Sequence, residues 1–228
     1  MARPSGHGPG WETRRQEIID QAAALFAERG YPATSIAEIV QAVGVGKGTL
    51  YYYIGSKEEL LVEIQDRVVR PLILVGRRIE ALDEHPLLRL RLLSEMQIEL
   101  MLKRLDHIWV YEHDHRYLTG MNLTRLLAQR HEYESIVSSL IQDAIDIGVF
   151  RPLNLRLAML QFLNLHNHTY QWVRPDGGWS AADLSREYCV TLSAGLGGRA
   201  VAVSEELEER VREFRANYQG PSLSAINA

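Results

Sequence analysis

The sequence predicts an all-α protein, and two observations carry that prediction. Apolar side chains recur at helical intervals from about residue 13 onward; Ile36, Ile39, Val40 and Val43, for example, fall at i, i+3, i+4 and i+7 on one helix face. No segment combines the alternating pattern of a half-buried strand with hairpin turns, so an isolated strand would have no partner. We therefore predict helices throughout.

Three predicted capping boxes place the first helices. In each, a Ser or Thr is followed three residues later by Glu or Gln: Thr13 with Gln16, Ser35 with Glu38, and Ser56 with Glu59. Gly30 and Gly44 should end the first two of these helices, because glycine favours a helix C-terminus. Pro71 should kink or restart the third, which is long.

More helices are expected in the remainder of the chain. The predicted segments begin at Pro86 and cover about residues 122–147, 154–173, 180–196 and 204–218. Between them, "RPDGG" predicts a loop, and "GLGG" at residues 195–198 predicts a break that links two helices.

Composition excludes several classes of protein. The chain has 228 residues, 46% of them hydrophobic, and a net charge of −4, so no global basic field attracts nucleic acid or an anionic membrane. Its one cysteine, Cys189, excludes an internal disulfide. Residues 1–12 lack the apolar run of a secretory signal, and no stretch approaches the ~20 apolar residues of a spanning helix. We expect a soluble, cytoplasmic protein with no membrane partner and a disordered tail over residues 1–12.

The stretch "GVGKGTLYYYIGSKEEL", residues 44–60, gives conflicting local signals. Thr49 to Ile54 are β-branched, aromatic or apolar, a composition typical of strands. Yet two short helices precede it, "GVG" forms a turn, and a capped helix follows, an order typical of a helix-turn-helix. We therefore predict a helix from about Lys47 to Tyr53, in which Leu50 and Ile54 face the neighbouring helices.

The opposite side of this helix suits DNA. Lys47 can reach a guanine edge or a phosphate, Gly48 allows a close backbone approach, and tyrosine hydroxyls can donate to phosphates. Residues 44–57 hold two of the chain's three lysines and no acid. The predicted DNA contacts are Thr34, Ser35, Lys47, Gly48, Thr49, Tyr51, Tyr52, Tyr53 and Lys57. The residues alone also allow a purely structural role, in which two helices cover the protein and the tyrosines pack on a partner helix.

Residues 13–65 resemble the DNA-binding domain of the TetR family of bacterial transcriptional regulators, through "LFAERGYPATS", "IAEIVQAVGV", "KGTLYYY" and "SKEEL". The resemblance implies a three-helix helix-turn-helix DNA-binding domain at residues 13–60 and a larger helical ligand-binding and dimerisation domain at residues 61–228. It implies a homodimer, joined by the helices near 154–173 and 180–196, that represses at a palindromic double-stranded DNA operator until a small-molecule effector releases it. The family often has Ser, His and Phe where this chain has Gly46, Tyr53 and Ile54, which leaves the operator sequence open.

Residues 148–184 resemble the C-terminal domains of TetR-type repressors of fatty-acid, sterol and aromatic catabolism, several of which respond to acyl-CoA thioesters. This implies an acyl-CoA, or another lipid or aromatic catabolite, as the effector. Trp109, His168, Trp172 and Arg174 are the candidate ligand residues: His168 and Trp172 lie four apart on the predicted helix, and Arg174 can meet a phosphate or carboxylate. Core or dimer-interface packing is the competing interpretation of these side chains.

No chemistry beyond binding is predicted. A nucleophile elbow, a P-loop and GxGxxG are all missing from the sequence. His113 and His115, two apart, would lie on opposite faces of a helix, and HExxH spacing is absent. We therefore predict no catalytic residue, no cofactor and no metal site. The alternative function is a helical small-molecule-binding or enzymatic protein without DNA binding.

Overall fold

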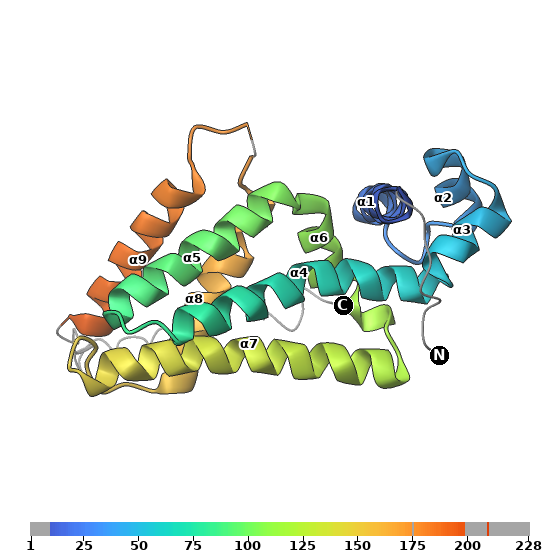
Figure 1. Ribbon diagram of the computed structural model, residues 1–228. Helices are drawn as coiled ribbons and strands as arrows, with labels where there is room; N and C mark the ends of the chain where they lie inside the picture. The colour runs from blue at the N-terminus through green and yellow to red at the C-terminus, as the bar shows by residue number, and fades with distance from the viewer. Residues whose placement is uncertain (1–9, 175, 199–208, 210–228) are drawn as a thin grey trace. The chain divides into compact units, whose positions relative to one another are not determined.

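The computed structural model describes residues 10–174, 176–198 and 209. The chain divides into a unit of residues 1–197 and a second of residues 198–228, of which Glu209 alone is described beyond residue 198. Every regular element of the described residues is a helix, which confirms the all-α prediction (Figure 1). The first unit contains α1 (Trp11–Arg29), α2 (Ile36–Val43), α3 (Lys47–Ile54), α4 (Lys57–Glu80), α5 (Pro86–Lys103), α6 (Leu105–His113), the 3₁₀ turn η1 (His115–Tyr117), α7 (Gly120–Asp146), α8 (Leu155–Asn167), the 3₁₀ turn η2 (Thr169–Gln171) and α9 (Ala181–Gly197).

Two regions with predictions lie outside the described residues: the tail over residues 1–9 and, apart from Glu209, the helix expected near 204–218. None of the described helices has the length and apolar content needed to cross a membrane.

The first helix begins earlier than predicted. Gly10, at φ 102°, precedes α1, and its carbonyl already accepts the Arg14 N–H at 3.0 Å, so the predicted box at Thr13 is wrong. Glycine adopts this left-handed backbone without the steric cost that other residues pay. Gln16 donates instead to Glu12, one helical turn back.

Of the other two predicted boxes, Ser35–Glu38 forms completely, whereas at Ser56 only the serine half is present. Ser35 Oγ accepts the Glu38 N–H at 3.2 Å, and the Glu38 carboxylate accepts the Ser35 N–H at 2.7 Å. Ser56 Oγ accepts the Glu59 N–H at 3.0 Å and starts α4. Both caps satisfy helix N–H groups that have no partner within the helix. They fix the starts of α2 and α4, the helices before and after α3, whose Leu50 is fully buried as predicted.

Helix α4 continues across Pro71 without a break, so the predicted restart is wrong. Residues on both sides of the proline, Val68 and Ile73 among them, are buried where α4 packs along α5 and α7. Gly76 lets α7 come close, since a Cβ there would lie 3.2 Å from Ile136 Cγ2. Burial of this apolar stripe offsets the hydrogen bond that proline removes.

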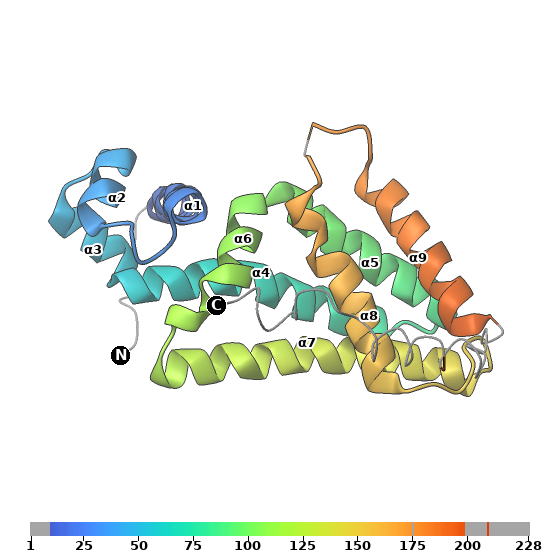
Figure 2. The ribbon, with the colours of Figure 1, turned by 180° about the vertical axis from the view of Figure 1, so that it is seen from behind.

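The remaining helices cover α4 and one another: α7 runs beside α4, α9 beside α5, and α8 packs on α7 (Figures 1 and 2). One predicted boundary here is wrong and another is confirmed. Helix α8 ends at Asn167 rather than near 173, and Thr169, whose Oγ1 donates to Leu165 O at 3.1 Å, opens η2 instead. Helix α9 starts at its Ser180–Asp183 cap as predicted and ends at Gly197, one residue beyond the predicted 196 and within the predicted break at residues 195–198.

Candidate nucleic-acid interface and effector cavity

Two arginines of α1 hold α3 in place. Arg15 is buried, donates through Nε to the Tyr53 carbonyl at 3.3 Å, and pairs with Glu63 at 2.7 Å. Arg14 donates to the Val43 carbonyl at 2.5 Å, just before the turn into α3. Charged donors on otherwise unsatisfied helix-end carbonyls are strong hydrogen bonds. Helix α1 thus binds the C-terminal part of α3 and the end of α2 that precedes it.

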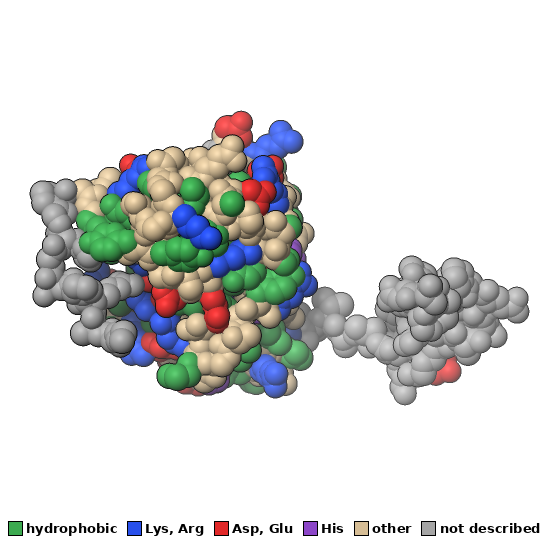
Figure 3. Space-filling view, turned by 90° about the vertical axis from the view of Figure 1, so that its right-hand side faces the viewer, with side chains coloured by type: hydrophobic (Ala, Val, Ile, Leu, Met, Phe, Trp, Pro, Cys, Tyr) green, Lys and Arg blue, Asp and Glu red, His purple; other side chains and the backbone are tan. Residues whose placement is uncertain are grey.

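The outward side of α3 carries most of the predicted DNA contacts. Five of them are exposed and lie together: Lys47, Gly48, Thr49, Tyr51 and Tyr52. Tyr52 is the most open of the tyrosines, with 61% of its surface exposed. Figure 3 views the end of the molecule that carries α2 and α3, and its hydrophobic, basic and acidic side chains are interspersed. A contact here would rely on individually placed donors and rings rather than on a uniform positive patch.

Tyr53 differs from its neighbours because it is only half-exposed. Its ring stacks on Trp11 with centroids 5.6 Å apart and meets Tyr52 edge-on at 5.5 Å. The stack links the end of α3 to the start of α1. Trp11 was not among the predicted site residues, because nothing local in the sequence pairs residues 42 positions apart.

Thr34 and Ser35 have different environments in the structure: the first is buried and the second is exposed. Thr34 is 1% exposed, and its hydroxyl donates to the Gly30 carbonyl at 3.0 Å, so its predicted phosphate contact is wrong: the side chain is occupied in closing the turn after α1. Ser35 is exposed at the start of α2. The cap uses its oxygen as an acceptor, so the hydroxyl proton can still be donated to a phosphate.

The Lys57 ammonium is bound on one side by Tyr31. Its Nζ donates to the Tyr31 carbonyl at 2.5 Å and lies 4.2 Å from the centre of the Tyr31 ring. Partial burial lowers the pKa of Lys57, against the opposing charges of Asp114 and Glu38. An ammonium has three N–H donors, so this attachment fixes the cation while leaving further donors for another acceptor.

The four predicted ligand residues do not meet around one cavity. Trp109 is partly exposed and stacks on His113 at 4.2 Å. His168 ends α8, whereas Trp172 follows η2, so the two do not share a helix face as predicted. The turn at Thr169 redirects the chain between them. Trp172 instead lies edge-on to Trp179, and Arg174 is exposed.

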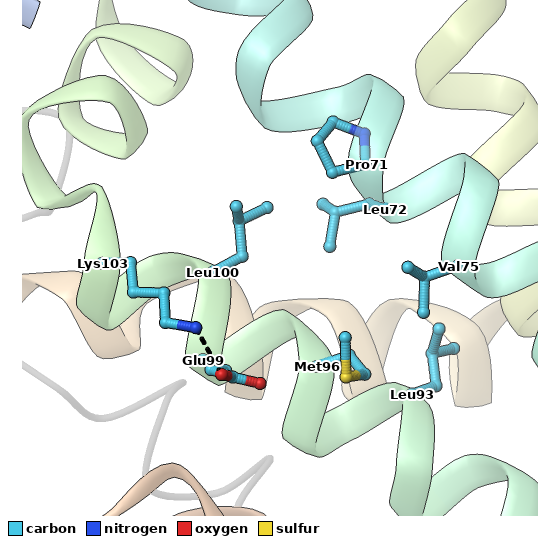
Figure 4. A pocket seen from close by; sticks show the side chains of 8 residues that line it. All are labelled: Pro71, Leu72, Val75, Leu93, Met96, Glu99, Leu100 and Lys103. Atoms are coloured by element: carbon cyan, nitrogen blue, oxygen red, sulfur yellow. Dashed lines mark hydrogen bonds and ion pairs between the residues drawn. The ribbon is translucent and has the colours of Figure 1, made fainter.

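A different site, between α4 and α5, has the character of a ligand pocket. It is a cavity of about 180 Å³ lined by Pro71, Leu72, Val75, Leu93, Met96, Glu99, Leu100 and Lys103 (Figure 4). The lining is apolar except at one end, where Lys103 and Glu99 form an ion pair at 2.5 Å. The apolar run "LLRLRLLSEMQIELMLKRL" had predicted a helix, but which of its leucines face a cavity depends on the packing against α4.

Among the described residues, no group of three or more His, Cys, Asp or Glu side chains is arranged to hold a metal ion.

Two family profiles match the chain. One, described as "Bacterial regulatory proteins, tetR family", matches residues 18–64, and the other, "Tetracyclin repressor-like, C-terminal domain", matches residues 83–196. The HTH-type transcriptional repressor KstR2 of Mycobacterium tuberculosis is 26% identical, over 81% of this chain and 93% of its own.

Solved structures are similar over most of their length. The TetR family transcriptional regulator PfmR from Thermus thermophilus is 30% identical with a TM-score of 0.73, covering 78% of this chain and 98% of its own. AibR, solved in complex with isovaleryl coenzyme A and operator DNA, is 26% identical with a TM-score of 0.68, covering 78% of this chain and 97% of its own.

Proposed function

Because this chain belongs to the TetR family of bacterial regulatory proteins, we propose that it is a homodimeric repressor that an acyl-CoA thioester releases from a palindromic operator. Its role as a transcriptional regulator follows from the family match in both halves of the chain. The observation that carries the DNA-binding surface is the exposed, cationic and tyrosine-rich outer side of α3. The similar proteins are named as regulators, and we propose no catalytic activity.

In the proposed complex, α3 enters the major groove with its N-terminal residues toward the bases. Lys47 and Thr49 would read base edges, while the Lys57 ammonium and the hydroxyls of Tyr51, Tyr52 and Ser35 would bind phosphates. Two copies related by a two-fold axis would place two α3 helices in successive turns of the groove, which requires half-sites spaced by whole helical turns.

The DNA surface is tested with Lys47→Ala and Tyr52→Ala on an operator that the wild-type protein selects from genomic fragments. We expect each variant to lose about tenfold or more in affinity, and Lys47→Ala to relax the preference for the base pair that Lys47 reads. Arg78→Ala is the matched control, because it removes an exposed charge on α4 away from α3. Wild-type affinity in both α3 variants would refute the assignment of this surface.

Helices α8 and α9 are the proposed dimer interface. Leu157 and Leu160 on α8 and Val190 on α9 are exposed apolar side chains, which a second copy would bury. Leu160→Glu should therefore convert the dimer to a monomer in analytical ultracentrifugation and abolish operator binding. Leu74→Glu, at an equally apolar exposed position on α4, serves as the control. A dimeric Leu160→Glu protein would contradict the proposed interface.

The α4–α5 cavity is the proposed effector site. Its volume of about 180 Å³ is below the ~300–1,000 Å³ typical of pockets that enclose a whole drug-sized ligand. It therefore suits the acyl end of a thioester, with the CoA phosphates outside and near Lys103. The complex of AibR with isovaleryl coenzyme A supports this chemical class. An anionic ligand would compete with Glu99 for the Lys103 ammonium.

The effector site is tested with Leu100→Trp, which fills the cavity. We expect this variant to bind operator normally but to lose both its thermal stabilisation by acyl-CoAs and its release from DNA. Leu88→Trp is the control, because Leu88 is an exposed residue of the same helix outside the cavity. The same measurements with free fatty acids and with CoA alone separate the contributions of the acyl end and the CoA end of the ligand. If no acyl-CoA shifts the melting temperature of the wild-type protein, the effector class is wrong, although the DNA-binding role remains.

A further inference from the structure

The segment that follows α6 contacts the DNA-binding helices at a point the proposed function does not use. Asp114 ends α6 and is 4% exposed. Its Oδ2 accepts the backbone N–H of Tyr31 at 3.3 Å, although the two residues are 83 positions apart. Tyr31 lies directly after Gly30, where α1 ends. The contact therefore joins the larger helical domain to the turn between α1 and α2.

Tyr31 connects this contact to Lys57. Its N–H is bound by Asp114, and its carbonyl accepts the Lys57 ammonium at 2.5 Å. The cation also lies 4.2 Å from the centre of the Tyr31 ring and 5.8 Å from that of Phe26, distances typical of cation–π contacts. Asp114, Tyr31 and Lys57 thus form a continuous chain of polar contacts across the domain junction.

The Tyr31 ring is itself fixed from both domains. It stacks on Tyr117 of η1 with centroids 5.5 Å apart and an interplanar angle of 27°, and it meets Phe26 of α1 edge-on at 5.1 Å. A shift of η1 relative to α1 would therefore disturb the ring and the N–H of Tyr31 together. Both of these groups help to define where the Lys57 ammonium lies.

We propose that Asp114 is a positioning residue for DNA binding: through Tyr31, it holds the Lys57 ammonium at the start of α4 ready for a phosphate. The inference rests on the proposed function, in which Lys57 is a DNA contact. A long lysine side chain otherwise loses rotamer freedom when it binds, and holding it in place beforehand reduces that loss. Any effector-driven movement of Asp114 would then weaken DNA binding through this cation.

The test compares Asp114→Ala with Asp114→Asn, alone and combined with Lys57→Ala, on the wild-type operator. Asn can still accept the Tyr31 N–H, whereas Ala cannot. We expect Asp114→Ala to reduce affinity about threefold to tenfold, within the range of coupled residues, and to lower the salt slope. Asp114→Asn should restore both, and Asp114→Ala should change neither once Lys57 is already Ala.

Asn122→Ala is the control for general damage to the junction. Asn122 donates to Glu58 of α4 at 3.0 Å, so its loss removes a nearby junction contact but leaves Tyr31 intact, and its salt slope should equal that of the wild type. If Asp114→Ala weakens binding equally in the Lys57→Ala background, or Asp114→Asn fails to restore it, the inference is wrong. If the wild type and Lys57→Ala bind the operator equally well, this inference alone is wrong. If the wild-type protein selects no operator, the proposed function is wrong.

Discussion

Gly48 offers a substitution that separates folding from DNA binding. In the structure a Cβ at this position would meet no heavy atom within 4 Å, and the residue lies on the exposed side of α3. Alanine favours a helix over glycine by roughly 0.5–1 kcal/mol. Gly48→Ala should therefore raise the free energy of unfolding by up to about 1 kcal/mol, which corresponds to a melting-temperature increase of ~2–4 °C in a protein of this size.

The same methyl group should oppose DNA binding. It would project between Lys47 and Thr49, where the proposed complex brings the α3 backbone against the groove, and steric overlap in a packed contact costs about 1–3 kcal/mol. We expect operator affinity in fluorescence anisotropy to fall by a factor of about 5 to 150, while calorimetry shows a higher melting temperature.

Gly44→Ala is the control. A Cβ there also meets no heavy atom within 4 Å, but φ of 66° makes alanine strained, so this variant should melt at a lower temperature. Gly48→Ala protein with wild-type affinity would refute a close approach of the α3 backbone to DNA.

Two further predictions concern the core. Burial lowers the pKa of His107 and of His166 to about 4 from the usual 6.5, so between these values the unfolded chain binds more protons than the folded one. The free energy of unfolding should thus decrease as the pH falls through this range, by roughly 2 kcal/mol per histidine between pH 7 and 5. In urea unfolding, His166→Gln should lose less of this free energy over the same pH range than the wild type. Gly76→Ala should cost roughly 1–3 kcal/mol because the added Cβ would lie 3.2 Å from Cγ2 and 3.3 Å from Cδ1 of Ile136. Adding Ile136→Val removes the Cδ1 contact and should recover part of that loss. An unchanged urea midpoint in Gly76→Ala would contradict this.

The DNA-binding helices were predictable because their signals are local. Ser35 and Ser56 cap the helices that follow them, and Leu50 and Ile54 face inward, as the spacing required. The composition of Thr49 to Ile54 favoured a strand, but the capped helices before and after it correctly indicated a helix. What local patterns lack is tertiary contact: the stack of Trp11 on Tyr53 joins residues 42 positions apart. The bond of Thr34 to Gly30 and the start of α1 after Gly10 are local contacts that the capping-box pattern does not describe.

The ligand region was predicted less well for the same reason. Aromatic and polar side chains near His168 and Trp172 indicated a site, but their relative placement depends on the end of α8 at Asn167 and on the η2 turn that follows. The cavity arises where α4 and α5 pack against each other, and leucines that line it have the same spacing as leucines that fill a core. Periodicity identifies the apolar side of a helix but not whether that side is completely filled.

Helix α4 is the element through which the proposed cavity and the proposed DNA surface can affect each other. It carries Leu72 in the cavity lining and Lys57 at its N-terminal end, about 22 Å apart at 1.5 Å per residue. Between them, Arg67 donates to Asp20 of α1 at 2.6 Å, so a movement of α4 at the cavity also acts on α1.

Coupling between two ligands typically amounts to 1–3 kcal/mol, and a net hydrogen bond contributes about 1 kcal/mol. Rearranging one to three of the contacts that join α1, α4 and α6 is therefore sufficient to change operator affinity about 5- to 150-fold. The effector need not unfold any helix, provided that it binds the two arrangements of α4 with affinities that differ by this same factor.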